Sequence, residues 1–126
     1  MKHITLFSLA LLLSFGVMAQ RRQVVSIHEN GNPEFVVWTK GKNEKSRVVK
    51  EEAYYPDGTV EYTGTYRREK EHGTWIFYYE TGIRKMKKNY RDGVLQGVTK
   101  EFAPDGSLRN EIHYRDGRVE REIRHK

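Results

Sequence analysis

No cysteine occurs among the 126 residues of the chain, and only three prolines do. The absence of thiols excludes disulfide bonds, cysteine nucleophiles and thiolate metal sites. It also excludes a lipoprotein anchor, because that lipid is attached to a cysteine. Acidic and basic residues are interleaved and leave a formal net charge of +6, which favours anionic partners only weakly. The chain must therefore hold its fold by burial and hydrogen bonding alone.

The N-terminal segment differs in composition from everything that follows it. Lys2 precedes an apolar stretch from about Ile4 to Leu13, which is too short to span a bilayer, and Ala19 is a small residue at the expected cleavage point. This pattern predicts a secretory signal peptide over residues 1–19. The alternative, an N-terminal membrane anchor, is disfavoured because no stop-transfer pattern follows. We therefore expect an exported protein, periplasmic or secreted, that is not a lipoprotein.

Four sets of residues recur at a spacing of 24. They are the turn glycines Gly58, Gly82 and Gly106; the tyrosines Tyr66, Tyr90 and Tyr114; Gly73 with Gly97; and Gly93 with Gly117. A fixed period shared by independent markers indicates a repeat protein. The markers predict three repeats over residues 49–126, with a charged cap at the C-terminal end. Residues 20–48 form a divergent segment, read as a degenerate repeat around Gly31 whose spacing is off by a few residues.

Each repeat contains its own hairpin chemistry. In Pro56-Asp57-Gly58, proline and aspartate suit a type I turn, and glycine suits the left-handed position that closes a G1 bulge. The runs between turns are rich in strand-forming residues, and none has a helical apolar stripe. The pattern predicts an all-β fold, an elongated antiparallel sheet of tandem β-hairpin repeats. Six aromatic residues are expected to stack in ladders as its structural core: Tyr54, Tyr66, Tyr78, Tyr90, Phe102 and Tyr114.

These repeats resemble the bacterial variant of the MORN (membrane occupation and recognition nexus) family. The resemblance rests on the aromatic strand over residues 73–79, the turn over 80–82 and the closing segment over 90–93. It implies a scaffold or binding role, and proteins of this type are often filed as antitoxin-like members of toxin–antitoxin systems. The chain departs from the family pattern at Arg68-Glu69, where Asp-Gly is expected, and at Arg121, where glycine is expected. The first departure leaves the type of that turn open.

No catalytic or metal-binding constellation is present in the sequence after residue 19. Its serines lie outside Gly-x-Ser-x-Gly and Ser-x-x-Lys contexts, and its histidines lack metal-ligand spacing. Residues 24 apart occupy equivalent positions, and we call each such set a column. The column of His72 holds Gln96 in the next repeat, which indicates a solvated position. The sequence therefore predicts a protein that is not an enzyme and that holds no cofactor and no metal.

The central aromatic run provides the candidate contact site. Trp75 replaces Glu51 and Thr99 of the neighbouring repeats, and Phe77 replaces Ala53 and Glu101, so the repeat itself does not require rings there. An exposed aromatic pair would be a binding hot spot. The alternative is that the N-terminal segment, Val24 to Val37, covers the pair. The predicted binding residues are Trp75, Phe77 and Tyr79, with Lys85 and Lys87 beside them on the next strand.

These observations favour an exported, non-enzymatic scaffold that binds a protein or an envelope surface through an aromatic sheet face. The alternative is an antitoxin-like or immunity-like protein that neutralises a toxin by binding. Weak contact with anionic lipid or polysaccharide is compatible with the basic residues. Nucleic acid is not an expected partner, because cations alternate in direction along the strand and the export signal removes the chain from nucleic acid. The oligomeric state is left open.

Overall fold

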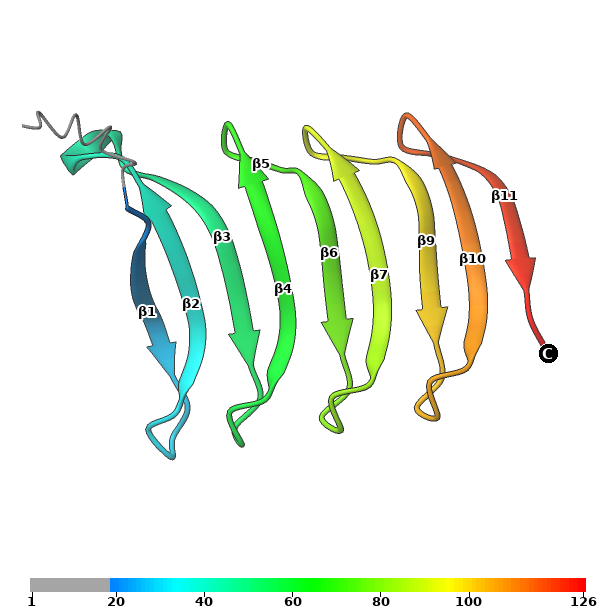
Figure 1. The fold of residues 1–126 in the computed structure, drawn as a ribbon, viewed down its shortest axis with the longest axis horizontal. Coiled ribbons are helices and arrows are strands. Elements are labelled where there is room, and N and C mark those ends of the chain that lie inside the picture. Colours follow the sequence, from blue (N-terminus) through cyan, green and yellow to red (C-terminus); the bar gives the residue numbers. More distant parts are fainter. Residues whose placement is uncertain (1–18) are drawn as a thin grey trace, which may run out of the picture.

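The computed structural model describes residues 19–126, so the predicted signal peptide, Ala19 excepted, lies outside the described residues. One antiparallel sheet runs the length of the molecule, with strands in the order β1-β2-β3-β4-β6-β7-β9-β10-β11 (Figure 1). The strands are β1 (Arg21–Ile27), β2 (Pro33–Lys40), β3 (Arg47–Tyr54), β4 (Val60–Arg67), β6 (Gly73–Tyr78), β7 (Arg84–Arg91), β9 (Gly97–Phe102), β10 (Leu108–Arg115) and β11 (Arg118–Arg124). The predicted all-β sheet of tandem hairpins is confirmed.

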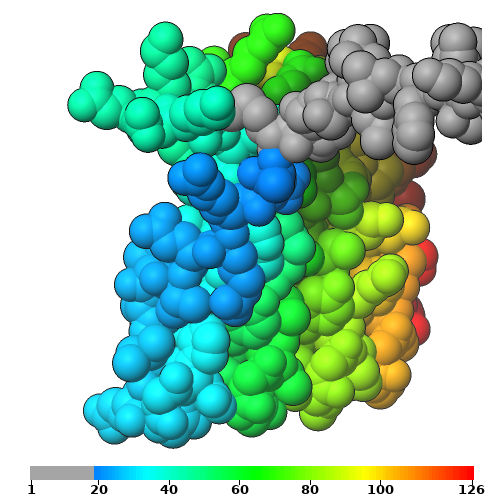
Figure 2. All heavy atoms as spheres, turned by 60° about the vertical axis from the view of Figure 1, so that its left-hand side comes forward, coloured from blue at the N-terminus to red at the C-terminus, as the bar shows by residue number. Residues whose placement is uncertain are grey.

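Three short elements lie off the main strand order. β5 (Lys70–Glu71) pairs with β4, and β8 (Val94–Leu95) pairs with β7. The 3₁₀ turn η1 (Asn43–Lys45) lies between β2 and β3. In the space-filling view the hairpins follow one another as successive bands of colour across the molecule (Figure 2). No helix among the described residues is long and apolar enough to cross a membrane.

The turns at one end of the hairpins share a single geometry. Gly58 has a φ of +89°, its N–H donates to the carbonyl of Tyr55 at 2.9 Å, and the Tyr55 N–H donates to Thr59 at 2.8 Å. This is the type I turn with a G1 bulge that the Pro-Asp-Gly pattern predicts. Gly82 and Gly106 repeat it with φ values of +86° and +87°.

The N-terminal hairpin, β1–β2, uses the same turn. Gly31 has a φ of +87°, and its N–H donates to the His28 carbonyl at 2.9 Å. The spacing from Gly31 to Gly58 exceeds the repeat period by three residues, which is the length of η1. An insertion between β2 and β3 therefore accounts for the irregular spacing of this unit.

The two faces of the sheet differ from the expected ones. Directly paired residues lie on the same face of a sheet, and the pairs Tyr62–Phe77, Trp75–Lys88 and Gly73–Tyr90 define one of them. We call this the aromatic face; its rings are Tyr62, Tyr66, Trp75, Phe77 and Tyr90. We call the other side the opposite face; it carries Tyr54, Tyr78 and Phe102.

The six repeat aromatics that were predicted to stack in ladders are divided between the two faces of the sheet. Tyr66, Tyr90 and Tyr114 lie on the aromatic face, whereas Tyr54, Tyr78 and Phe102 lie on the other. The physical reason is a register shift beside each Gly-ended turn, such as the one between Ala53 and Tyr54. A bulge places two residues against one and changes the parity of the strand beyond it. Val60 consequently pairs with Tyr54 instead of sharing the face of Tyr62.

The sheet forms a single layer, and few of its side chains are fully covered. The described residues exposed by less than a tenth are Val36, Val37, Ala53, Trp75 and Thr99, apart from glycine. The most C-terminal strand, β11, carries ion pairs such as Arg115–Glu120 at 2.9 Å. Charged side chains at a sheet edge disfavour pairing with other chains.

The turns at the other end of the hairpins are two-residue turns in which both residues have positive φ. The values are +49° and +83° for Asp92-Gly93, and +50° and +78° for Asp116-Gly117. Such turns are of type I′. Arg68 and Glu69 adopt the same conformation, at +51° and +66°, although neither is glycine. The departure from Asp-Gly therefore leaves the turn type unchanged and introduces backbone strain.

We expect Glu69→Gly to stabilise the protein by about 1 kcal/mol, because a non-glycine residue in the left-handed region costs about 1–2 kcal/mol. The free energy of unfolding from urea denaturation measures the change. The matched control is Gly93→Glu in the next repeat, which should destabilise by a similar amount, since an added Cβ there meets no atom closer than 3.6 Å. A Glu69→Gly variant no more stable than wild type would contradict the assigned strain.

Candidate binding surface

The five predicted binding residues do not form one surface. Trp75 and Phe77 lie on the aromatic face, whereas Lys87 lies on the opposite face, where it pairs with Ile76 and Lys100. The Lys85 ammonium lies 5.7 Å from the centre of the Tyr79 ring, beside the turn. Successive side chains of a strand point to opposite faces, so residues that are close in sequence are separated here by the sheet itself.

Trp75 is the centre of the aromatic face and is only 7% exposed. Its ring stacks on Tyr62 at 6.1 Å between centroids, with 18° between the planes. Tyr66 and Tyr90 meet it edge-on at 5.5 and 5.9 Å. These neighbours cover the indole, rather than residues 24–37. The expectation of an exposed Trp75 is therefore wrong, while Phe77 remains half-buried at 5.4 Å from Tyr62.

Gly64 makes the burial of Trp75 possible. A Cβ at position 64 would lie 2.2 Å from Trp75 Cδ2, so the indole rests directly on the glycine backbone. The indole N–H donates to the carbonyl of Thr65 at 3.2 Å. Lys88 and Ile112 occupy the column of Gly64 in later repeats. Gly64 is smaller, and Trp75 larger, than the residues at the equivalent positions of the other repeats. This paired difference in size was the sequence signal for their contact.

Glu51 is a second member of this cluster that the sequence reasoning did not select. Its carboxylate accepts hydrogen bonds from the hydroxyls of Tyr62 at 3.1 Å and Tyr66 at 3.0 Å. Burial, and then the charge of Glu51, raise the pKa of Tyr62 to about 12 and raise the pKa of Tyr66 as well. Both hydroxyls therefore stay protonated and act as donors at neutral pH.

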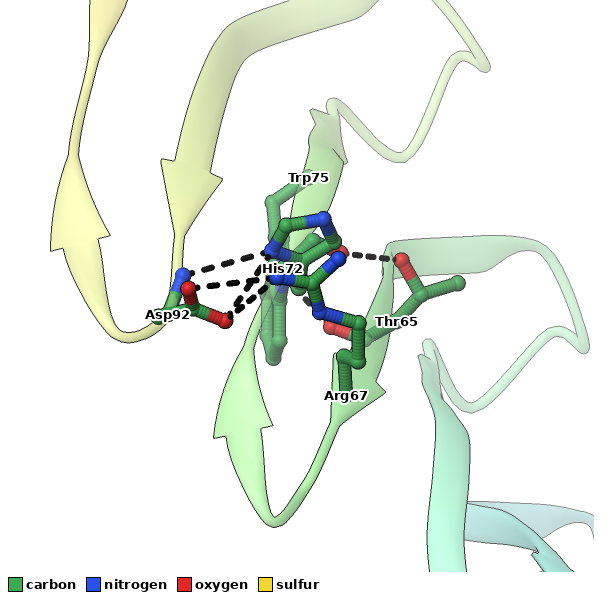
Figure 3. A network of polar contacts seen from close by, with 5 residues as sticks. All are labelled: Thr65, Arg67, His72, Trp75 and Asp92. Carbon is green, nitrogen blue, oxygen red and sulfur yellow. Dashed lines mark hydrogen bonds and ion pairs between the residues drawn. The ribbon is translucent and has the colours of Figure 1, made fainter.

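A polar network joins adjacent repeats at the type I′ turns (Figure 3). The Asp92 N–H donates to His72 Nδ1 at 3.3 Å, and Arg67 donates to the Asp92 carboxylate at 3.1 Å. Gln96 accepts from the Asp116 N–H at 2.9 Å in the same way. The His72 side chain is 31% exposed, so its position is partly solvated as predicted, and the structure adds a tie to the turn. Histidine and glutamine can replace each other at this position because both provide a hydrogen-bond acceptor for a backbone N–H of the type I′ turn.

Tyr79 belongs to a matching set of contacts at the Gly-ended turns. Its hydroxyl donates to the carbonyl of Phe102 at 2.8 Å, and the Tyr55 hydroxyl donates to the carbonyl of Tyr78 at 2.6 Å. His28 holds the equivalent place in the N-terminal hairpin, with Nε2 at 2.7 Å from the Tyr54 carbonyl. The position of Tyr79 is thus explained by a tie to the next hairpin. The spacing of 24 between Tyr55 and Tyr79 was the signal for it.

No group of three or more histidine and acidic side chains in residues 19–126 is placed to hold a metal ion. Half-buried rings surround a buried indole, and a carboxylate lies at one side of them.

Gly64→Ala should destabilise the protein by about 1–3 kcal/mol, because the added methyl group overlaps the Trp75 ring and forces it to move. In a Trp75→Thr background, which copies Thr99, the same change should cost little. A double-mutant cycle from urea denaturation measures the coupling. Equal costs of Gly64→Ala in the two backgrounds would show that the glycine is not there for the indole.

Tyr79→Phe should lower the free energy of unfolding by about 0.5–1.5 kcal/mol, the usual contribution of one hydrogen bond. Phe102 would lose a donor to its carbonyl while the ring stays in place. Tyr78→Phe is the matched control, since no hydrogen bond of the Tyr78 hydroxyl occurs among the described residues. Thermal denaturation of the two variants side by side decides the question, and equal melting temperatures would contradict the role given to Tyr79.

The comparison with protein families agrees with the repeat boundaries seen in the structure. The model of the MORN repeat variant matches residues 47–68, 71–92 and 95–116. The matched segments are spaced by the same period as the hairpins. No curated protein matches the chain. MORN repeats generally act as scaffold or binding modules without catalytic activity of their own. With more than half of its residues matched, the chain belongs to the MORN repeat variant family.

Proposed function

We propose that this chain is an exported, non-enzymatic scaffold that binds a protein of the cell envelope through its aromatic face. The observation that carries the proposal is the ring cluster around Trp75, which is half-covered on an otherwise open sheet face. Among residues 19–126, the main contacts of each strand are with its neighbours in the sheet, and no second layer lies over the rings.

The cluster has the physical properties of a contact site. Aromatic rings contribute large apolar area on binding, and hot spots are enriched in them. Tyr62, Tyr66 and Tyr90 are held in place by Trp75, so little side-chain freedom remains to be lost in a complex. Phe77 lies beside Tyr62 and extends the same surface.

Export is supported by the sequence pattern of residues 1–19 alone. A charged residue, a short apolar stretch and Ala19 follow the order of a secretory signal. The cluster then faces the periplasm or the exterior, where envelope proteins are the available partners.

The opposite face supports a weaker, secondary contact with anionic groups. Lys87 and Lys100 lie directly across from each other, and like charges in that position repel. No ion pair of either lysine occurs among the described residues. Glu111, which pairs with Lys100 from the other side, offsets part of this repulsion, and an anion placed between the two ammonium groups would relieve the rest.

The test is affinity capture from envelope extracts with wild type, Phe77→Ala and Phe77→Glu as bait. Both substitutions copy residues that the same column already holds, Ala53 and Glu101, so the fold should tolerate them. We expect at least a tenfold loss of captured partner. Trp75→Glu is unsuitable because it would bury a carboxylate and disturb folding.

Ile76→Ala is the control, since Ile76 is the neighbouring residue on the opposite face. It should capture the same partners as wild type. Circular dichroism shows whether each variant is folded. If folded Phe77 variants retain full capture, the aromatic face is not the binding surface.

A further inference from the structure

Glu51 occupies a position where the repeat does not need a carboxylate. The same column holds Trp75 in the second matched repeat and Thr99 in the third. Its hydrogen-bond donor Tyr62 is equally particular to the first repeat, because Met86 and Asn110 replace it later. The pair therefore reflects a property of this end of the aromatic face rather than a requirement of the fold.

Glu51 lines a groove of about 440 Å³ beside β2, β3 and the connection between them. Phe35, Val37 and Val48 provide apolar lining, and Tyr66 adds the edge of the ring cluster. Glu51 is directly paired with Val37, so its carboxylate lies next to apolar side chains. Arg47 and Glu69 also line it, so the groove combines a net charge of one negative with an apolar and aromatic lining.

The carboxylate of Glu51 keeps unused acceptor capacity. A carboxylate offers about four lone-pair sites, and the Tyr62 and Tyr66 hydroxyls occupy one on each oxygen. No cationic group among residues 19–126 lies within ion-pair distance of Glu51. By contrast, the adjacent Glu52 on the opposite face meets the Lys50 ammonium at 2.5 Å.

The nearest cation of the groove is engaged elsewhere. Arg47 Nε lies 4.0 Å from Glu69, and both side chains are more than half exposed. An exposed pair of this kind is weak and well solvated.

We propose that this groove binds the side chain of an arginine or lysine of the partner protein. The cationic head would pair with the free acceptor sites of Glu51, and the aliphatic stem would lie along Phe35 and Val37. Tyr66 offers a ring to the cation. The inference rests on the proposed function, because it specifies which kind of side chain of the protein partner binds beside the aromatic face.

The first test titrates the full chain with N-acetyl-arginine N-methylamide and with N-acetyl-lysine N-methylamide. Chemical shifts in an NMR spectrum report the binding. We expect saturable shifts in the millimolar range, centred on Val37, Glu51 and Tyr66. The neutral isostere N-acetyl-citrulline N-methylamide should produce none. Equal shifts with citrulline, or none with either cation, would overturn the proposal.

The second test uses Glu51→Gln, which keeps the shape but removes the charge. The amide oxygen still accepts from one tyrosine hydroxyl, and the other hydroxyl can accept from the amide NH2. We expect affinity for the better cation to fall at least tenfold. Glu101→Gln is the matched control, since it makes the same charge change on the same face two repeats away. Unchanged affinity in Glu51→Gln, or equal losses in both variants, would overturn the groove as the site.

Failure of this inference is distinguishable from failure of the proposed function. The titration uses defined small molecules and depends on no captured partner. A chain that ignores arginine and lysine but still shows Phe77-dependent capture keeps its aromatic binding face and loses only the cation groove.

Discussion

Lateral pairing between successive hairpins carries this fold, because no second layer covers either face of the sheet in residues 19–126. Backbone hydrogen bonds join each strand to the next, and side chains add ties at both ends. Tyr55 and Tyr79 reach the next hairpin at the Gly-ended turns, and His72 and Gln96 do so at the type I′ turns. Stability then accumulates from neighbour to neighbour, as in other repeat arrays.

This architecture distinguishes side chains that the repeat explains from side chains that it does not explain. A side chain that recurs in its column, such as Tyr66 with Tyr90 and Tyr114, is explained by the array. A side chain that departs from its column must be explained locally. Trp75 and Gly64 explain each other through direct contact. Glu51 has no such explanation among the described residues, because neither tyrosine that bonds to it requires a charged acceptor.

The residues of the turns were sufficient to predict the fold, but they did not predict which side chains lie on which face of the sheet. Pro-Asp-Gly and Asp-Gly specify their turns through local backbone preferences, which the sequence displays directly. The register shifts in the strands that follow these turns have no such signature, and one extra residue placed Tyr54, Tyr78 and Phe102 on the opposite face. The burial of Trp75 depends on a glycine on another strand, and the bonds of Glu51 depend on two tyrosines of β4. Contacts of this kind follow from register, which strand propensity does not provide.

Tyr62 connects the stability of the array to its proposed binding site. Its ring stacks on Trp75, and its hydroxyl donates to Glu51. Any movement of the indole therefore shifts the donor that orients the carboxylate in the groove. Conversely, a cation bound to Glu51 would favour the conformation in which both contacts are made, and a ligand that binds only the folded state stabilises it. The proposed aromatic site and the proposed groove are consequently joined through Tyr62, where the first two matched repeats meet.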